Sequence, residues 1–243
     1  MEKQLVIGLD LSFNSTGISI MECENHIPKK IKFYRIVFDD ESNKTGKIYH
    51  PKDIPNINQI IYRMPTNIRT DDVLLDASDK NNTEQTYTTL RAMICSKKIN
   101  KIIGKEISEY KPDIIICTIE NYVMPSFAGP NSLKSVSGLI LLQGFVREFL
   151  IRTKITIDTN KKFNDYNLKD LYIYTPTPTQ NKSYFSGNGK AEKTEMIKTF
   201  ETIFEGNRLL PNLNHGKVDD IIDSFALLTH GWYIYLKKEI WKK

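Results

Sequence analysis

The chain has few of the residues that bind soft metals or form disulfides. Its 243 residues include three cysteines and four histidines, with no Cys-x-x-Cys pair and no histidines at zinc-site spacing. Cys95 and Cys117 lie inside apolar runs, which is typical of buried thiols in a reducing compartment. The sequence therefore argues against a zinc-dependent or disulfide-stapled protein.

Long apolar segments are also missing. The start, MEKQLVIGLDLS, lacks the apolar core of a signal peptide, and no run reaches the length of a membrane span. The net charge of +5, from 34 basic and 29 acidic residues, permits a nucleic-acid partner without requiring one. We expect a soluble cytoplasmic protein without a membrane partner.

The pattern of apolar residues predicts an α/β protein. Strands are expected at 4–10, 16–22, 31–38, 113–120 and 170–175. Helices are expected at 86–110, 132–152, 190–204 and 217–237. Leading strands followed by alternating helices and strands predict a mixed five-stranded sheet with helices on both faces. The polar stretch at about 39–85 is expected to be an insertion or long connection within one domain, 1–243.

The expected helix at 132–152 is apolar nearly all round. Such a helix is either fully buried or shared between the core and an interface with a second subunit. The residues alone leave both alternatives open.

Acidic residues fall at the ends of two expected strands and at the start of the last helix. Asp10 and Glu120 close their strands, and KVDDIIDSFALL places Asp219, Asp220 and Asp223 on the helix. Residues three or four apart on a helix share a face, so Asp223 can align with Asp219 or Asp220. Clustered carboxylates need a neutralising cation, and hard oxygen ligands favour Mg²⁺, with Mn²⁺ as a substitute. Two such ions suit hydrolysis of a phosphodiester.

Each acid also has a simpler interpretation. Asp10 could start a turn, Glu120 could cap the next loop, and Asp219 and Asp220 could complement the helix dipole. The combination of these acids in this chain order is harder to explain without a metal site. The segment GNGKAEKT is similar to a phosphate loop but lacks the Walker spacing, so nucleotide binding is rejected.

Four segments resemble the RuvC family of Holliday-junction resolvases, within the ribonuclease H-like superfamily. They are IGLDLSFNSTGISI (7–20), IENYVM with SLKSVSG (119–124 and 132–138), TPTQNKSYFSGNGKAEKTEM (177–196) and KVDDIIDSFAL (217–227). The first and last are common to many nucleases of the superfamily, and the middle two narrow the resemblance to resolvases.

The resemblance implies a ribonuclease H-like fold and a homodimer that cuts opposing strands of a four-way DNA junction. It implies that Asp10, Glu120, Asp223 and one of Asp219 or Asp220 hold two metal ions. Bacterial members usually space the last pair by three, which favours Asp220. Mitochondrial-type members carry a Lys-x-Asp-Asp-x-x-Asp-Ser pattern like the one here, which keeps Asp219 as a candidate.

Residues in the matching segments are candidate DNA contacts. Apolar and aromatic groups after Glu120 can stack on or wedge between bases at a branch point; lysines can contact phosphates, and glycines allow close backbone approach. The candidates are Tyr122, Val123, Met124, Phe127, Lys134, Gln180, Lys182, Gly187, Gly189, Lys190 and Lys193.

The chain also departs from the family pattern. Leu11-Ser12 replaces the Pro-Gly that often follows the first aspartate in bacterial members, and the 39–85 stretch is longer than the family core requires. Both departures suggest a divergent phage or viral member, located in the host cytoplasm. The alternatives are a ribonuclease H-like nuclease for other branched DNA, flaps or RNA–DNA hybrids, and an inactive DNA-binding scaffold.

Overall fold

A mixed β-sheet forms the centre of the molecule. The computed structural model describes residues 1–39, 57–63, 80–122, 130–159, 166–204 and 219–241. The strands of the sheet are β1 (Lys3–Asp10), β2 (Ser15–Glu24), β3 (Ile27–Asp39), β4 (Ile57–Arg63), β5 (Ile114–Ile119) and β6 (Asp170–Tyr174). Their order across the sheet is β4-β3-β2-β1-β5-β6.

The strand directions divide the sheet into two parts. β1, β2 and β3 pair antiparallel as a meander, with Asp10 opposite Gly17. β5 pairs parallel with β1, and β6 pairs parallel with β5. These five strands form the expected mixed sheet. A sixth strand, β4, pairs parallel with β3 at one edge and comes from within the polar 39–85 stretch.

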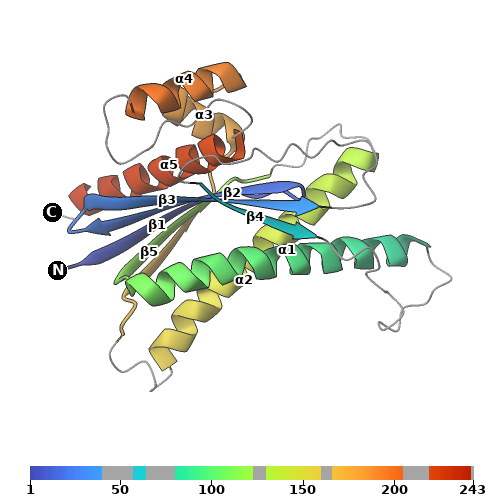
Figure 1. Ribbon diagram of the computed structural model, residues 1–243, viewed down its shortest axis with the longest axis horizontal. Helices are drawn as coiled ribbons and strands as arrows, with labels where there is room; N and C mark the ends of the chain where they lie inside the picture. Colours follow the sequence, from blue (N-terminus) through green and yellow to red (C-terminus); the bar gives the residue numbers. More distant parts are fainter. Residues whose placement is uncertain (40–56, 64–79, 123–129, 160–165, 205–218, 242–243) are drawn as a thin grey trace.

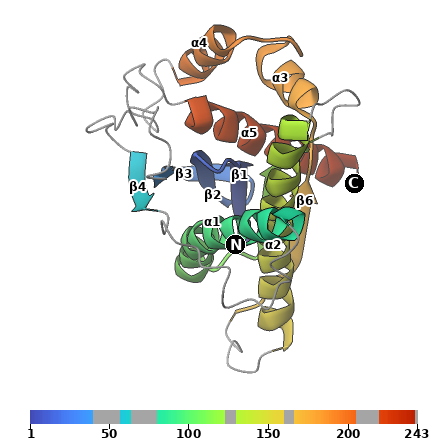
Figure 2. The same ribbon diagram turned by 90° about the vertical axis from the view of Figure 1, so that its right-hand side faces the viewer.

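Helices cover both faces of the sheet, as expected (Figure 1). On one face lie α1 (Lys80–Tyr110) and α2 (Pro130–Thr159). On the other lies α5 (Asp219–Trp241), with α3 (Pro178–Ser186) and α4 (Lys193–Phe204) outside it (Figure 2). No helix within the described ranges is long and apolar enough to cross a membrane.

The alternation of side chains along the strands gives each face its own apolar cluster. Odd-numbered residues of β1, such as Ile7 and Leu9, pack with α1 and α2, whereas Val6 packs with α5. Asp10 shares the parity of Val6, so it belongs to the α5 face. The three cysteines are buried and free, which agrees with the thiols expected from the apolar runs.

The helix expected at 132–152 is longer than predicted and is not fully buried. Leu142, Val146 and Leu150 pack into the core, whereas Ile151 and Ile155 are 49% and 55% exposed. The first of the two alternatives for this helix is therefore wrong. Its exposed apolar residues lie outside the core.

Helix α3 is not among the helices expected from the sequence, although its boundaries have clear local causes. Thr177 and Gln180 form a reciprocal capping box, and Pro178 occupies the first turn. Gly187 ends the helix with φ 78°, a left-handed conformation that glycine adopts without strain. Gly187 and Gln180 therefore have structural roles that do not depend on DNA.

Candidate functional site

Two glycines bring α5 into direct contact with the sheet backbone. A Cβ atom on Gly8 would lie 2.0 Å from the carbonyl oxygen of Ser224, and one on Gly17 would lie 1.9 Å from that of Asp220. Side chains at these positions are therefore sterically impossible without moving the helix. Ser19 of β2 and Ser224 share a hydrogen bond of 2.7 Å that fixes the register of the helix. This close approach places the first turns of α5 beside the end of β1.

Three further contacts hold the chain at the end of β5. The side-chain amide of Gln143 in α2 donates a 2.7 Å hydrogen bond to the carbonyl of Glu120. The backbone N–H of Asn121 donates to the carbonyl of Pro176, which follows β6. The Tyr122 hydroxyl donates to the carbonyl of Leu11, the residue after Asp10, at 2.5 Å. These bonds tie the ends of β1, β5 and β6 together.

The structure brings Asp10, Glu120 and Asp223 close enough to perturb one another. Burial raises the pKa of Asp10 well above its usual value, and the charges of Asp223, Glu120 and Asp220 raise it further, while Lys193 lowers it. Acids at two strand ends and on a helix therefore form one electrostatic site. We call Asp10, Glu120 and Asp223 the acid cluster.

The other two members of the cluster show the same effect. Burial and then the charge of Asp223 raise the pKa of Glu120 to about 7, with Lys182 opposing. Burial and then the charge of Asp219 raise the pKa of Asp223 to about 6, with Lys182 and Lys193 opposing. The lysines offset only part of the repulsion, so the acid cluster carries unbalanced negative charge.

The donor set of the cluster suits a hard divalent cation, because it consists of carboxylate oxygens only. Among the residues that the structure describes, no three acidic, histidine or cysteine side chains are close enough to form a ready-made ion cage. The carboxylates of the acid cluster are thus neighbours whose charges interact without forming such a cage.

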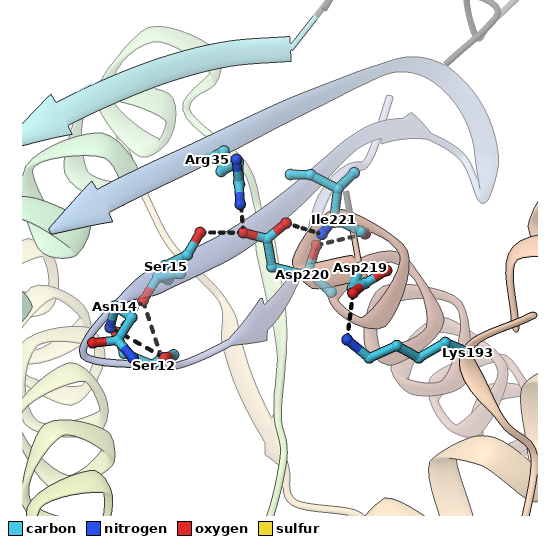
Figure 3. A network of polar contacts seen from close by, with 10 residues as sticks. Ser12, Asn14, Ser15, Arg35, Lys193, Asp219, Asp220 and Ile221 are labelled. Carbon is cyan, nitrogen blue, oxygen red and sulfur yellow. Dashed lines mark hydrogen bonds and ion pairs between the residues drawn. The ribbon is translucent and has the colours of Figure 1, made fainter. Parts of the chain in front are cut away.

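The two adjacent aspartates at the start of α5 have different surroundings (Figure 3). Asp220 is buried; it accepts a 2.7 Å hydrogen bond from Nε of Arg35 and another from the hydroxyl of Ser15. Asp219 points instead toward Lys193, with which it forms an ion pair. Arg35 is not among the site residues expected from the sequence, although a charged residue inside the apolar run IKFYRIVF is a signal.

A pocket lies between α3, α4 and α5, next to the acid cluster. Its lining combines two acids with two lysines and three apolar side chains: Asp219, Asp223, Lys182, Lys193, Met196, Ile197 and Ile222. Asp219 and Asp223 are four residues apart and share this pocket, whereas Asp220 faces Arg35 and Ser15.

The candidate DNA contacts have varied positions. The ammonium group of Lys182 donates to the carbonyl of Ala191 at 2.9 Å and faces the pocket. Lys190 is exposed, and Gly189 packs against Thr179, where an added Cβ would lie 2.8 Å from its methyl group. Val123, Met124 and Phe127 lie outside the described residues, as does the side chain of Lys134.

Comparisons with known proteins give matches among solved structures only. No family model matches the chain, and no curated protein matches it. One similar structure is RuvC of Thermus thermophilus, at 13% identity over 96% of each chain and a TM-score of 0.44. A second is T. thermophilus RuvC in complex with a Holliday junction substrate, at 12% identity over 98% of this chain and 97% of that one, TM-score 0.41.

A third similar structure is the yeast mitochondrial Holliday junction resolvase Ydc2. It is 13% identical over 96% of this chain and 80% of its own, with a TM-score of 0.46. These neighbours are resolvases of the kind that the four sequence segments resemble. At such low identities and TM-scores, the likenesses carry no inference about what this chain binds or cuts.

Proposed function

We propose that this chain is a metal-dependent, structure-selective endodeoxyribonuclease that resolves four-way DNA junctions by paired phosphodiester hydrolysis. The observation that carries the proposal is the acid cluster. It combines carboxylates at the end of β1, directly after β5 and on α5: the charges of Asp223 and Glu120 raise the pKa of Asp10, and the charge of Asp223 raises that of Glu120. Burying such charges without full compensation costs stability, which is typical of a site that a cation completes.

The metal ligands in this proposal are Asp10, Glu120 and Asp223, with Asp219 as the fourth. Asp219 shares the pocket with Asp223, whereas the Asp220 carboxylate is engaged by Arg35 and Ser15. Bound there, two Mg²⁺ or Mn²⁺ ions would supply Lewis-acid stabilisation of the charge that develops on the phosphate.

The chain's own residues prepare the site for that chemistry. Gln143 orients the backbone at Glu120, and Tyr122 holds the turn that follows Asp10. Lys182 and Lys193 line the pocket beside the carboxylates, where they are placed to bind phosphate oxygens of the DNA. Lys190, Lys134 and the residues after Tyr122 complete the proposed DNA contacts.

Paired cleavage of a four-way junction needs two active sites, so we also propose a homodimer. The exposed apolar residues of α2 support this part of the proposal. They are Ile140, Leu141, Ile151 and Ile155, between 38% and 55% exposed. Apolar residues gathered on one helix face are typical of a subunit interface. Light scattering coupled to gel filtration should give the mass of a dimer.

The decisive experiment is cleavage of a synthetic four-way junction labelled on each strand, in Mg²⁺. We expect nicks on opposing strands at symmetry-related positions. Three-way junctions, flaps and RNA–DNA hybrids of matched length serve as competing substrates. Faster cleavage of a hybrid or a flap than of the junction would contradict junction resolution, and failure to cut any substrate in Mg²⁺ or Mn²⁺ would leave a binding scaffold.

The same assay separates the two neighbouring aspartates. We expect Asp219→Asn to lower the cleavage rate by about two orders of magnitude, because it weakens a Lewis-acid effect worth several kcal/mol. We expect Asp220→Asn to lower the free energy of unfolding by about 3 kcal/mol, because it breaks the pair with Arg35. Wild-type cleavage by Asp219→Asn would overturn the ligand assignment.

A further inference from the structure

An aromatic cluster lies where α3 crosses α5, beyond the acid cluster. The rings of Tyr184 and His230 stack with centroids 4.5 Å apart and planes 7° apart. Tyr233 lies 5.1 Å from Tyr184, and the ammonium group of Lys237 lies 4.8 Å from the centre of the Tyr233 ring. We call Tyr184, His230 and Tyr233 the aromatic platform.

The platform is more exposed than the aromatic residues of the core. Tyr184 and Tyr233 are 36% and 40% exposed, whereas Phe185 and Phe225 on the same two helices are 8% and 3% exposed. Joining α3 to α5 explains part of the arrangement, since the Tyr184 hydroxyl also donates to the carbonyl of Thr229 at 3.1 Å. It does not explain why the tilted ring of Tyr233 and the Lys237 ammonium group extend the cluster toward solvent.

The platform and the acid cluster lie on one stripe of α5. Asp223, His230 and Lys237 are seven residues apart, which is close to two helical turns, so they share a face. Gly231, about 100° round the helix from His230, faces Thr118 of the sheet. Figures 1 and 2 show α3 on the side of α5 that faces away from the sheet. A ligand held at the acid cluster can therefore continue along this stripe.

The rise of an α-helix gives the distance along α5 between Asp223 and the aromatic platform. At about 1.5 Å per residue, His230 lies about 10 Å and Tyr233 about 15 Å along the axis from Asp223. A stacked nucleic-acid strand advances about 3.4 Å per nucleotide, so these separations correspond to about three to four nucleotides.

We propose that the aromatic platform stacks on an unpaired nucleobase three to four nucleotides from the cleaved phosphate, with Lys237 on the adjoining backbone. This inference rests on the proposed nuclease function and extends its DNA-contacting surface. Aromatic side chains stack on any base, because every base has a π-face, and a neighbouring cation adds affinity. The platform therefore favours substrates with unpaired nucleotides near the cut and does not read sequence.

The test compares two single strands that differ only in their bases. The probes are a fluorescent oligothymidylate and a strand of equal length in which abasic residues replace the thymidines. We expect the wild-type chain to bind the oligothymidylate about tenfold more tightly, because stacking on one base is worth roughly one decade of affinity. Equal affinity for the two strands would overturn the proposal that the platform stacks on a nucleobase.

Variants of Tyr233 show whether this residue causes the preference for the oligothymidylate over the abasic strand. We expect Tyr233→Leu, which keeps apolar bulk but removes the π-face, to bind the oligothymidylate about tenfold more weakly and the abasic strand unchanged. Tyr233→Trp should retain the preference for bases. The matched control is Tyr87→Ala, a tyrosine 39% exposed on α1, which should leave both affinities unchanged. A loss for Tyr233→Leu that is equal on both strands would assign Tyr233 a structural role and overturn the proposal.

Cleavage of the four-way junction by the same proteins separates this inference from the proposed function. If the wild-type chain binds the oligothymidylate more tightly than the abasic strand but cuts no junction, the proposed nuclease function is refuted and the stacking proposal is retained. A chain that cuts the junction but binds both strands equally refutes the platform alone. If both hold, Tyr233→Leu should raise KM for a junction that carries unpaired thymidines three to four nucleotides from the cut, while kcat stays at the wild-type value.

Discussion

Two buried acidic sites lie on opposite faces of the same sheet, and they differ in how their charge is balanced. On the α1 face, Glu106 is 1% exposed and accepts hydrogen bonds of 2.5 Å from both the Lys32 ammonium group and the Tyr34 hydroxyl. Lys32 also pairs with Glu22 at 2.7 Å. Each buried charge of this site therefore has a partner within the chain.

On the α5 face, the carboxylates of the acid cluster have one another as near neighbours. Their pKa values rise through burial and through repulsion by neighbouring acids, and the nearby lysines counter only part of that rise. The comparison teaches that a buried carboxylate paired with a cationic side chain of the same protein stabilises the fold. Carboxylates that repel one another in a pocket indicate a site that serves something else, here the proposed metal ions.

The largest expected effect comes from Asp10→Asn. We expect the rate of junction cleavage to fall by about three orders of magnitude, because the Lewis-acid contribution is worth several kcal/mol. Junction affinity should be retained, and the melting temperature without divalent cations should rise, because one repelling charge is gone. The matched control is Asp158→Asn, an exposed aspartate paired with Lys154, which should cut at the wild-type rate. Strong Mg²⁺-dependent cleavage by Asp10→Asn would sink the assignment.

Removal of the paired acid on the α1 face should lower stability and leave cleavage unchanged. We expect Glu106→Ala to lower the free energy of unfolding by about 3 kcal/mol, because it leaves Lys32 and Tyr34 without their shared buried acceptor. Cleavage below the melting temperature should be unchanged. Glu109→Ala, which removes an exposed acid of the same helix, is the control for stability in urea. Wild-type stability of Glu106→Ala would mean that the contacts of Glu106 with Lys32 and Tyr34 do not stabilise the fold.

The smallest expected effect is on the pH dependence of stability without divalent cations. The folded-state pKa values of Glu120 and Asp223, about 7 and about 6, lie above their ordinary values of 4.5 and 3.8. Protonated carboxyls are thus favoured in the folded state, and their stabilising contribution, complete only below the ordinary pKa values, is lost as the pH rises through 6 and 7.

Thermal unfolding in EDTA from pH 4 to pH 8 measures this loss. We expect the melting temperature of Glu120→Gln to fall less across this range than that of the wild type. Mg²⁺ should raise the wild-type melting temperature more at pH 8 than at pH 5, because the cation binds carboxylates. Parallel melting curves for the two proteins across the range would refute the linkage.

Much of the sheet could be predicted from the sequence, because five of its six strands have short, strong apolar patterns. β4 was missed, since INQIIYR lies in a polar stretch and its pairing with β3 depends on the tertiary fold. α3 was missed for a different reason. Its apolar content is low, and its clearest signals are the capping box at Thr177 and the glycine at 187.

The acids could be identified from the sequence, but their partners could not. Arg35 and Asp220 are 185 residues apart, and Lys182 reaches the pocket from a helix that was not expected. Alignment of Asp223 with Asp219 or with Asp220 is equally allowed by helical spacing. The neighbouring strands and helices give the two aspartates different surroundings, and that information is tertiary.

The contact of α5 with Gly8 and Gly17 also has a consequence for how the sequence can change. The spacing between helix and sheet is set there by main-chain atoms, which every substitution in the surrounding core leaves in place. Apolar residues around the contact can therefore be exchanged over many generations while the distance from the end of β1 to the start of α5 stays constant. The two glycines thus fix this distance, and related chains can diverge widely in their interior while keeping the same arrangement of the acid cluster.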